Sequence, residues 1–283
     1  MRTCRGIASL RRALSACAGK QVGLVPTMGF LHEGHLSLVR ACRRECDVTV
    51  VSIFVNPAQF GPSEDLRRYP RDERRDSALL RKEQVDVLFV PGENEMYPSP
   101  YRTWVDVTDL DSKLCGRSRP GHFRGVATVV LKLLHLVRPQ RAYFGQKDAQ
   151  QALLIRQLVR DLNLPVTLRI LPIVRDSDGL ALSSRNVLLS ARERRAALAL
   201  PRCLRRARRL VEAGEKNARA VRAAMAAEIA CEPLLAIDYI AIVRLDDLEE
   251  TAEIEAGNTL VAAAVRAGRT RLIDNFLPGD RSC

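Results

Sequence analysis

The feature that most constrains the fold is an alternation of short apolar runs with segments of helical periodicity over residues 1–174. β-Branched runs such as residues 48–55 are typical of buried parallel strands. Strands are predicted at residues 22–26, 48–55, 85–90, 141–144 and 166–170. Helices are predicted within residues 1–20 and at 36–46, 72–84, 125–137 and 148–162. This order predicts an α/β fold, a Rossmann-like doubly wound parallel sheet whose ligands bind beyond the carboxyl ends of the strands.

The pattern changes after residue 174. A loop at residues 175–186 leads to Ala/Arg-rich helices within 191–230, and three short strand-like stretches follow at 237–243, 259–265 and 270–274. We therefore expect two domains, 1–174 and a smaller α+β domain at 175–283.

The net charge of +12 leaves two kinds of partner open, a nucleic acid or an anionic substrate. The densest arginine block, residues 192–209, lacks aromatic side chains that could stack on bases, which disfavours nucleic acid. Membrane insertion is not expected, because no apolar run approaches the roughly 20 residues of a spanning helix. Eight cysteines without a CxxC pair predict reduced thiols and a cytoplasmic protein.

A first candidate site lies between the first long strand and its helix. It contains Met28, Gly29, Phe30, Leu31, His32, Glu33, Gly34 and His35. The glycines allow a tight turn and close approach to a ligand, and the N-terminus of a helix favours phosphate. His32 and His35 are three residues apart and share a face of a helical turn. Two imidazoles placed there can stabilise charge that develops on a reacting phosphate.

Three further segments carry polar side chains at predicted strand or domain ends. Asn56 and Gln59 follow an apolar strand, where amides can bind the hydroxyl and carboxylate of a substrate or simply cap a loop. Gly145, Gln146, Lys147 and Asp148 follow another strand, with Gln151 one turn later. Lys147 suits a phosphate, and Asp148 suits a helix cap, a ribose hydroxyl or a metal.

The last segment is the glycine-led loop that contains Leu182, Ser183, Ser184 and Arg185. Two hydroxyls followed by Arg suit a mobile phosphate clamp, although an interdomain linker has the same composition. Taken together, the four segments predict a nucleotide site with a small polar co-substrate.

These segments, read as motifs, resemble a known family. PTMGFLHEGHLSLV, SIFVNPAQFGPSEDLRRYPRD, GHFRGVATVVLKLL, FGQKDAQQALLIRQLV and DGLALSSRN are similar to the pantothenate synthetase (pantoate–β-alanine ligase) family, in order and over nearly the whole chain. HEGH and LSSR resemble the two signatures of the HIGH-motif nucleotidyltransferases. The resemblance implies that pantoate attacks the α-phosphate of ATP, with Mg²⁺, and that β-alanine then converts pantoyl adenylate to pantothenate and AMP.

The resemblance also assigns residues. ATP would contact the segment from Met28 to His35, the segment Gly145, Gln146, Lys147 and Asp148, the backbone of Val174, and the segment Leu182, Ser183, Ser184 and Arg185. Gln59 and Gln151 would bind pantoate, with Asn56 and Arg119 as further site positions. We expect the catalytic residues to be His35 as proton donor, His32, Lys147, Ser183 and Arg185. A homodimer with a C-terminal lid domain is implied by the family alone.

The sequence departs from the family pattern at three positions. Gln146 stands where Glu is common, Phe30 replaces a smaller or polar residue, and Arg75 replaces one acid of a pair. The last change argues against a metal held by the protein at that point, so the phosphates are expected to hold Mg²⁺. Another HIGH-motif nucleotidyltransferase with a different small acid is the alternative, and Asn56, Gln59 and Gln151 argue against it.

Overall fold

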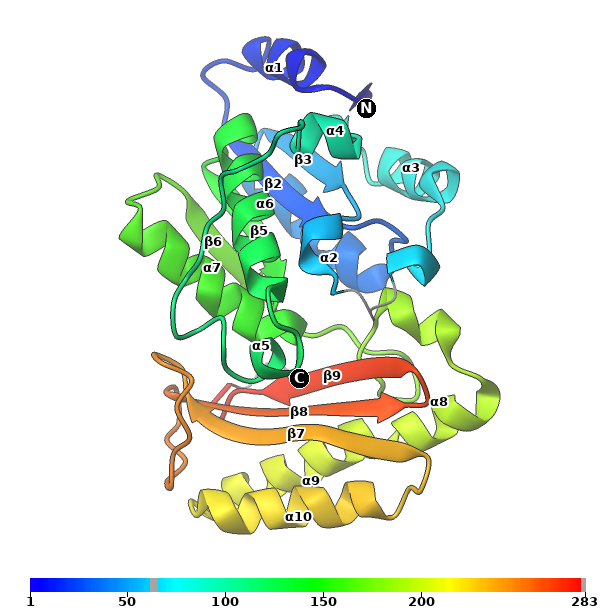
Figure 1. Cartoon of the computed structure of the whole chain (residues 1–283), viewed down its shortest axis with the longest axis vertical. Helices are drawn as coiled ribbons and strands as arrows, with labels where there is room; N and C mark the ends of the chain where they lie inside the picture. The colour runs from blue at the N-terminus through cyan, green and yellow to red at the C-terminus, as the bar shows by residue number, and fades with distance from the viewer. Residues whose placement is uncertain (62–65, 281–283) are drawn as a thin grey trace. The chain divides into compact units, whose positions relative to one another are not determined.

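The computed structural model describes residues 1–61 and 66–280. The chain divides into two compact units. The first comprises residues 1–145 and 150–171, and the second comprises residues 146–149 together with the chain from Pro172 onward. In Figure 1 the first unit runs from blue to green, and the second is mostly yellow-green to red.

A parallel sheet forms the centre of the first unit. Within the described residues it has six strands in the order β1-β4-β3-β2-β5-β6. The strands are β1 (Arg2–Cys4), β2 (Val22–Thr27), β3 (Val48–Ile53), β4 (Val87–Phe89), β5 (Arg141–Gly145) and β6 (Thr167–Leu171). Strand β2 pairs with β3 from Val22↔Val48 to Thr27↔Ile53. The residues that follow β2 and β3 therefore leave the sheet at the same edge.

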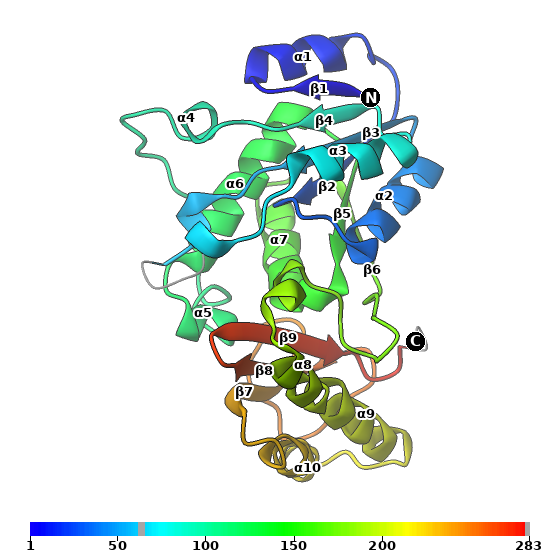
Figure 2. The same cartoon turned by 90° about the vertical axis from the view of Figure 1, so that its right-hand side faces the viewer.

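Both faces of this sheet are covered. Leu24 and Val25 are neighbours on β2 and point to opposite faces, yet both are fully buried. The helices of the unit are α1 (Ile7–Ser15), α2 (Glu33–Glu45), α3 (Glu73–Lys82), α4 (Glu93–Met96), α5 (Cys115–Ser118), α6 (His122–Val137) and α7 (Ala149–Asp161) (Figures 1 and 2). Leu38 of α2 and Leu80 of α3 share one core cluster with Val25. The predicted α/β parallel sheet is confirmed.

Several details of the first unit differ from the expectation: α4 and α5 were not predicted, α6 begins at His122 and not at residue 125, and β1 and α2 differ as well. Strand β1 was not predicted, because Arg2-Thr3-Cys4 has no apolar alternation, and it pairs with β4 at the sheet edge. Helix α2 begins at Glu33, three residues before the expected start at residue 36. Its first turn is polar and so lacks the apolar periodicity that marks the rest of the helix.

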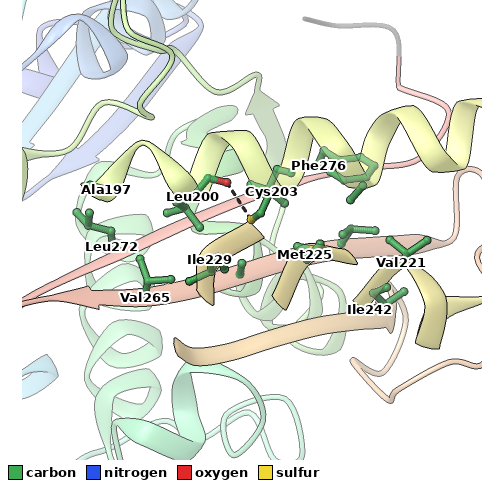
Figure 3. Packing of buried hydrophobic residues seen from close by; sticks show 14 of the residues in the cluster. Ala197, Leu200, Cys203, Val221, Met225, Ile229, Ile242, Val265, Leu272 and Phe276 are labelled. Atoms are coloured by element: carbon green, nitrogen blue, oxygen red, sulfur yellow. Dashed lines mark hydrogen bonds between the residues drawn. The ribbon is translucent and has the colours of Figure 1, made fainter. Parts of the chain in front are cut away.

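The second unit is α+β, as predicted. Its described residues form a three-stranded antiparallel sheet in the order β7-β8-β9. The elements are α8 (Ala191–Ala197), α9 (Ala199–Glu212), α10 (Ala218–Ala230), β7 (Leu235–Arg244), β8 (Thr259–Ala267) and β9 (Thr270–Phe276). Leu200 of α9, Met225 of α10 and Val265 of β8 belong to one buried cluster that joins the helices to the sheet (Figure 3).

The helices of the described residues include none that is both long and apolar enough to cross a membrane. Cysteines are unpaired wherever the structure describes them, and Cys42 and Cys203 are fully buried. Burial raises the pKa of both thiols to about 12, which keeps them protonated and poorly nucleophilic.

Candidate functional site

The loop between β2 and α2 places the two histidines at the start of a helix. His32 is the N-cap residue of α2, and His35 is its third helical residue. Their ring centroids are 4.0 Å apart. The backbone N–H of His32 donates to Nδ1 of His35 over 3.3 Å, so a neutral His35 ring carries its proton on Nε2. This arrangement leaves His35 in the form that can donate a proton through Nε2.

Asp76 holds this loop in place. Its side chain, on the first turn of α3, is 1% exposed and accepts from the backbone N–H of Phe30 (2.6 Å) and of Leu31 (2.8 Å). Burial raises the pKa of Asp76, and the two backbone hydrogen bonds counteract part of that rise. Sequence analysis did not propose Asp76, because an acid in the first turn of a helix is common and the contact spans 45 residues.

Gly29 is required by the geometry of the same turn. Its φ is +82°, and a Cβ there would lie 2.9 Å from Cγ2 of Ile53 and 3.1 Å from Oδ2 of Asp76. Phe30 and Arg75 lie close to this turn. The guanidinium of Arg75 lies 5.2 Å from the centre of the Phe30 ring and 3.6 Å from Oδ1 of Asp76. Arg75 therefore contacts both the Phe30 ring and the Asp76 carboxylate.

Asn56 and Gln59 lie directly after β3 and form a buried pair. Asn56 begins the short helix η1 (Pro57–Gln59), and its Nδ2 donates to Oε1 of Gln59 over 3.1 Å. Nε2 of Gln59 lies 3.0 Å from Sδ of Met28, which brings this amide to the loop before α2. The predicted substrate amides and the predicted ATP loop therefore meet within one unit.

Arg119 reaches the same backbone through His122. Nδ1 of His122 donates to the carbonyl oxygen of Gln59 over 2.8 Å, since a carbonyl can only accept. Nε2 of a neutral His122 then accepts from Nη1 of Arg119 over 2.9 Å. Sequence analysis missed His122, although it stands within the quoted GHFRG motif, because the motif alone does not reveal its partners.

The segment after β5 carries Lys147 and is fastened by a distant strand. Gln146, Lys147 and Asp148 form the short helix η3 just after Gly145. Nδ2 of Asn275, on β9, donates to the carbonyl oxygens of Gln146 and Lys147, each over 3.0 Å. Asn275 is 3% exposed and belongs with this segment to the second unit. Gln151, half-buried on α7, belongs to the first unit.

The loop that contains the two serines closes on itself. The backbone N–H of Leu182 donates to the carbonyl of Val174 over 3.0 Å. Oγ of Ser183 accepts from the backbone N–H of Arg185 at the start of η4 (Ser184–Leu188), and Ser184 is buried. A bidentate ion pair between Arg175 and buried Asp274 of β9 anchors the base of the loop. Strand β9 therefore supports both candidate phosphate segments of the second unit.

Residues 1–61 and 66–280 contain no cluster of metal-ligating side chains. None of the His, Cys, Asp or Glu side chains in these ranges forms a group of three or more that could hold a metal ion. A divalent cation at this site would depend on oxygens supplied by a bound phosphate.

Comparisons with known proteins agree with these features. The family model for pantoate-β-alanine ligase matches residues 2–277. The chain is 57% identical over 275 residues to the pantothenate synthetase of Roseiflexus sp. (strain RS-1), covering 97% of this chain and 98% of that protein. The pantothenate synthetase of Roseiflexus castenholzii is also 57% identical, over 277 residues that cover 98% of this chain and 99% of that protein.

Solved structures give the same result. Pantothenate synthetase from Thermus thermophilus has a TM-score of 0.94 at 48% identity, covering 98% of this chain and 99% of that one. The pantoate-β-alanine ligase of Francisella tularensis, complexed with β,γ-ATP and β-alanine, has a TM-score of 0.81 at 34% identity, with 98% and 97% covered. The chain belongs to the pantoate–β-alanine ligase family.

Proposed function

We propose that this enzyme joins pantoate and β-alanine through a pantoyl adenylate, using ATP. A carboxylate oxygen of pantoate attacks the α-phosphorus, and the bond from that phosphorus to the bridging oxygen breaks as pyrophosphate leaves. The neutral amine of β-alanine then attacks the acyl carbon, AMP leaves with its oxygen, and the amine loses a proton. Both steps depend on positioning and on stabilising charge at phosphate oxygens.

The observation that carries this proposal is the pair of imidazoles at the start of α2, in a loop held by buried Asp76. We assign the α- and β-phosphates to the backbone N–H groups and side chains at this helix start. Nε2–H of His35 donates to phosphate oxygen as pyrophosphate departs, and His32 supports the same charge. Lys147, Ser183 and Arg185 are assigned to the remaining phosphate oxygens.

Pantoate is assigned to the amides near Met28. Gln59 lies beside the loop assigned to ATP, which supports the assignment of the pantoate carboxylate to a position close to the phosphates. Gln151 is assigned to the same substrate, and Asn56 and Arg119 support Gln59 through its side chain and its backbone. β-Alanine, bound in the Francisella relative, is assigned as the second substrate here.

Mg²⁺ is assigned to the nucleotide. The described residues lack a group of three ligands, so the protein side chains do not fit a self-contained metal site. An ATP-bound Mg²⁺ keeps phosphate and water oxygens as its ligands. The family resemblance further supports a homodimer in the cytoplasm, for which light scattering provides the test of oligomeric state.

The decisive experiment is exchange of labelled pyrophosphate into ATP. We expect exchange that requires pantoate and does not require β-alanine, and AMP release that requires both. Exchange without pantoate, or exchange supported equally by other small hydroxy acids, would contradict the assigned substrate. Omitting Mg²⁺ should abolish exchange, and restoring it should recover the rate.

A further inference from the structure

Gln59 is surrounded by hydrogen-bonding groups whose polarity can be followed one by one. The residue is 7% exposed, so the orientation of its side-chain amide is decided by protein neighbours. An amide has a donor end, its NH₂ group, and an acceptor end, its oxygen, so its orientation decides which end is offered to a substrate. Asn56 forms hydrogen bonds with Gln59 and with three other groups.

The main chain fixes the orientation of Asn56. Its Nδ2 lies 3.0 Å from the carbonyl oxygen of Gly125, which can only accept. Its Oδ1 lies 3.3 Å from the backbone N–H of Ala58, which can only donate. A flipped Asn56 would place like polarity at both contacts, and at 1% exposure it has no water to compensate.

The orientation of Gln59 follows from that of Asn56. Nδ2 of Asn56 has a second hydrogen, which it donates to Oε1 of Gln59 over 3.1 Å. The other end of the Gln59 amide, Nε2, is directed at Sδ of Met28 over 3.0 Å. A thioether sulfur is a weak acceptor, so Nε2 is ready to donate to a stronger one.

Tyr97 is the last of the groups that hydrogen-bond to Asn56. Its hydroxyl donates to Oδ1 of Asn56 over 2.8 Å, a shorter contact than the 3.3 Å one from Ala58. Burial raises the pKa of Tyr97, so the hydroxyl keeps its proton over the physiological pH range. Tyr101 packs edge-on against its ring at 4.9 Å between centroids and holds the ring in place.

Gly125 makes the approach possible. A Cβ at this position would lie 2.3 Å from the carbonyl oxygen of Ala58 and 2.6 Å from the backbone nitrogen of Gln59. Any other residue would push α6 away from η1 and lengthen the Asn56 contact with the Gly125 carbonyl. The hydrogen bonds that run from Tyr97 through Asn56 to Gln59 form a relay. This relay depends on a close backbone contact as well as on side chains.

We propose that Tyr97 is a positioning residue, which holds Asn56 in the orientation that the main chain sets and so keeps Nε2 of Gln59, and not Oε1, facing the substrate. The site then selects a substrate that presents an acceptor oxygen, such as the carboxylate or an oxygen of a hydroxyl in pantoate. This inference rests on the proposed function only for the identity of the substrate. The relay itself is a property of the unliganded protein.

The kinetic test is Tyr97→Phe, with Tyr101→Phe as the matched control from the same aromatic cluster. Losing one buried hydrogen bond of the relay should raise KM for pantoate about fivefold. KM for ATP and the melting temperature should change little, and Tyr101→Phe should leave KM for pantoate unchanged. Equal effects on pantoate and ATP, or equal effects of the two variants, would overturn the positioning role.

A second measurement needs no catalysis and keeps the two proposals separable. In ¹⁵N-labelled protein, the side-chain NH₂ of Asn56 should exchange slowly with solvent, because both of its hydrogens are bonded. Exchange should accelerate in Tyr97→Phe and not in Tyr101→Phe. Fast exchange in the wild-type protein would refute the relay even if the enzyme uses pantoate. Slow exchange without pantoate-dependent activity would instead refute the proposed substrate and leave the relay standing.

Discussion

The loop before α2 and the segment after β5 both follow parallel strands, but they are fastened in different ways. Asp76, from a helix of the same unit, accepts from the backbone N–H groups of the first loop. Asn275, from β9, donates to the backbone carbonyls of the second. Asp76, which we call the acceptor clamp, belongs to the parallel-sheet unit, and Asn275, which we call the donor clamp, belongs to the antiparallel sheet. The same kind of turn can therefore be fixed by opposite chemistry.

The substitution with the largest expected effect in the first loop is His35→Ala. Removing a donor that stabilises developing charge should lower kcat by about 10²–10³-fold. Steady-state kinetics gives this loss, and thermal unfolding should show little change in stability. His135→Ala, on α6, is the matched control and should keep kcat near the wild-type value. A normal rate for His35→Ala would refute the assigned proton donor.

Asp76→Ala tests the acceptor clamp. It leaves the buried N–H groups of Phe30 and Leu31 without their acceptor, at a cost of about 2–4 kcal/mol in the free energy of unfolding. Urea denaturation measures this cost, and KM for ATP should rise as the loop loosens. Glu73→Ala, on the exposed side of the same helix, should cost under about 1 kcal/mol. Similar losses of unfolding free energy in Asp76→Ala and Glu73→Ala would show that Asp76 does not hold the loop.

Asn275→Ala tests the donor clamp. The carbonyls of Gln146 and Lys147 lose one donor, which should cost about 1–2 kcal/mol of stability and raise KM for ATP several-fold. Asn258→Ala, at a half-exposed position, is the control. Unchanged ATP kinetics in Asn275→Ala would mean that the position of Lys147 does not depend on β9.

The smallest expected effect concerns pH. The pKa of Asp76 is raised in the folded protein, so the native state binds more protons than the unfolded state at mildly acidic pH. The stability contributed by this group is present below its unfolded pKa and is lost as pH rises through its folded pKa. Wild-type stability relative to Asp76→Asn should therefore fall from about pH 3.5 upward. If the stability of the wild type relative to Asp76→Asn increased with rising pH, the direction assigned to the pKa shift of Asp76 would be wrong.

The same comparison explains which features the sequence could predict. Strand β3 was predictable because five of the six residues from Val48 to Ile53 are β-branched, and the structure buries all six. The histidines, glycines and serines were predictable because their spacing is local. Asp76 and Asn275 were not, because each acts on backbone groups 45 or more residues away and looks like an ordinary helix or strand residue. Helix α2 begins before its predicted start because its N-cap is His32, which is not a common N-cap residue.

The relay behind Gln59 limits how the substrate range of this enzyme can be redesigned. The orientation of the Asn56 amide is set by main-chain groups of Gly125 and Ala58, and the Asn56 amide in turn orients Gln59. A library that keeps Asn56 and Gln59 and varies only the residues around them would therefore keep favouring acids with acceptor oxygens. Acceptance of a substrate that offers a donor at this point requires replacing Gln59 itself, for instance by Glu, in which one oxygen can still accept from Asn56 and the other can accept from the substrate.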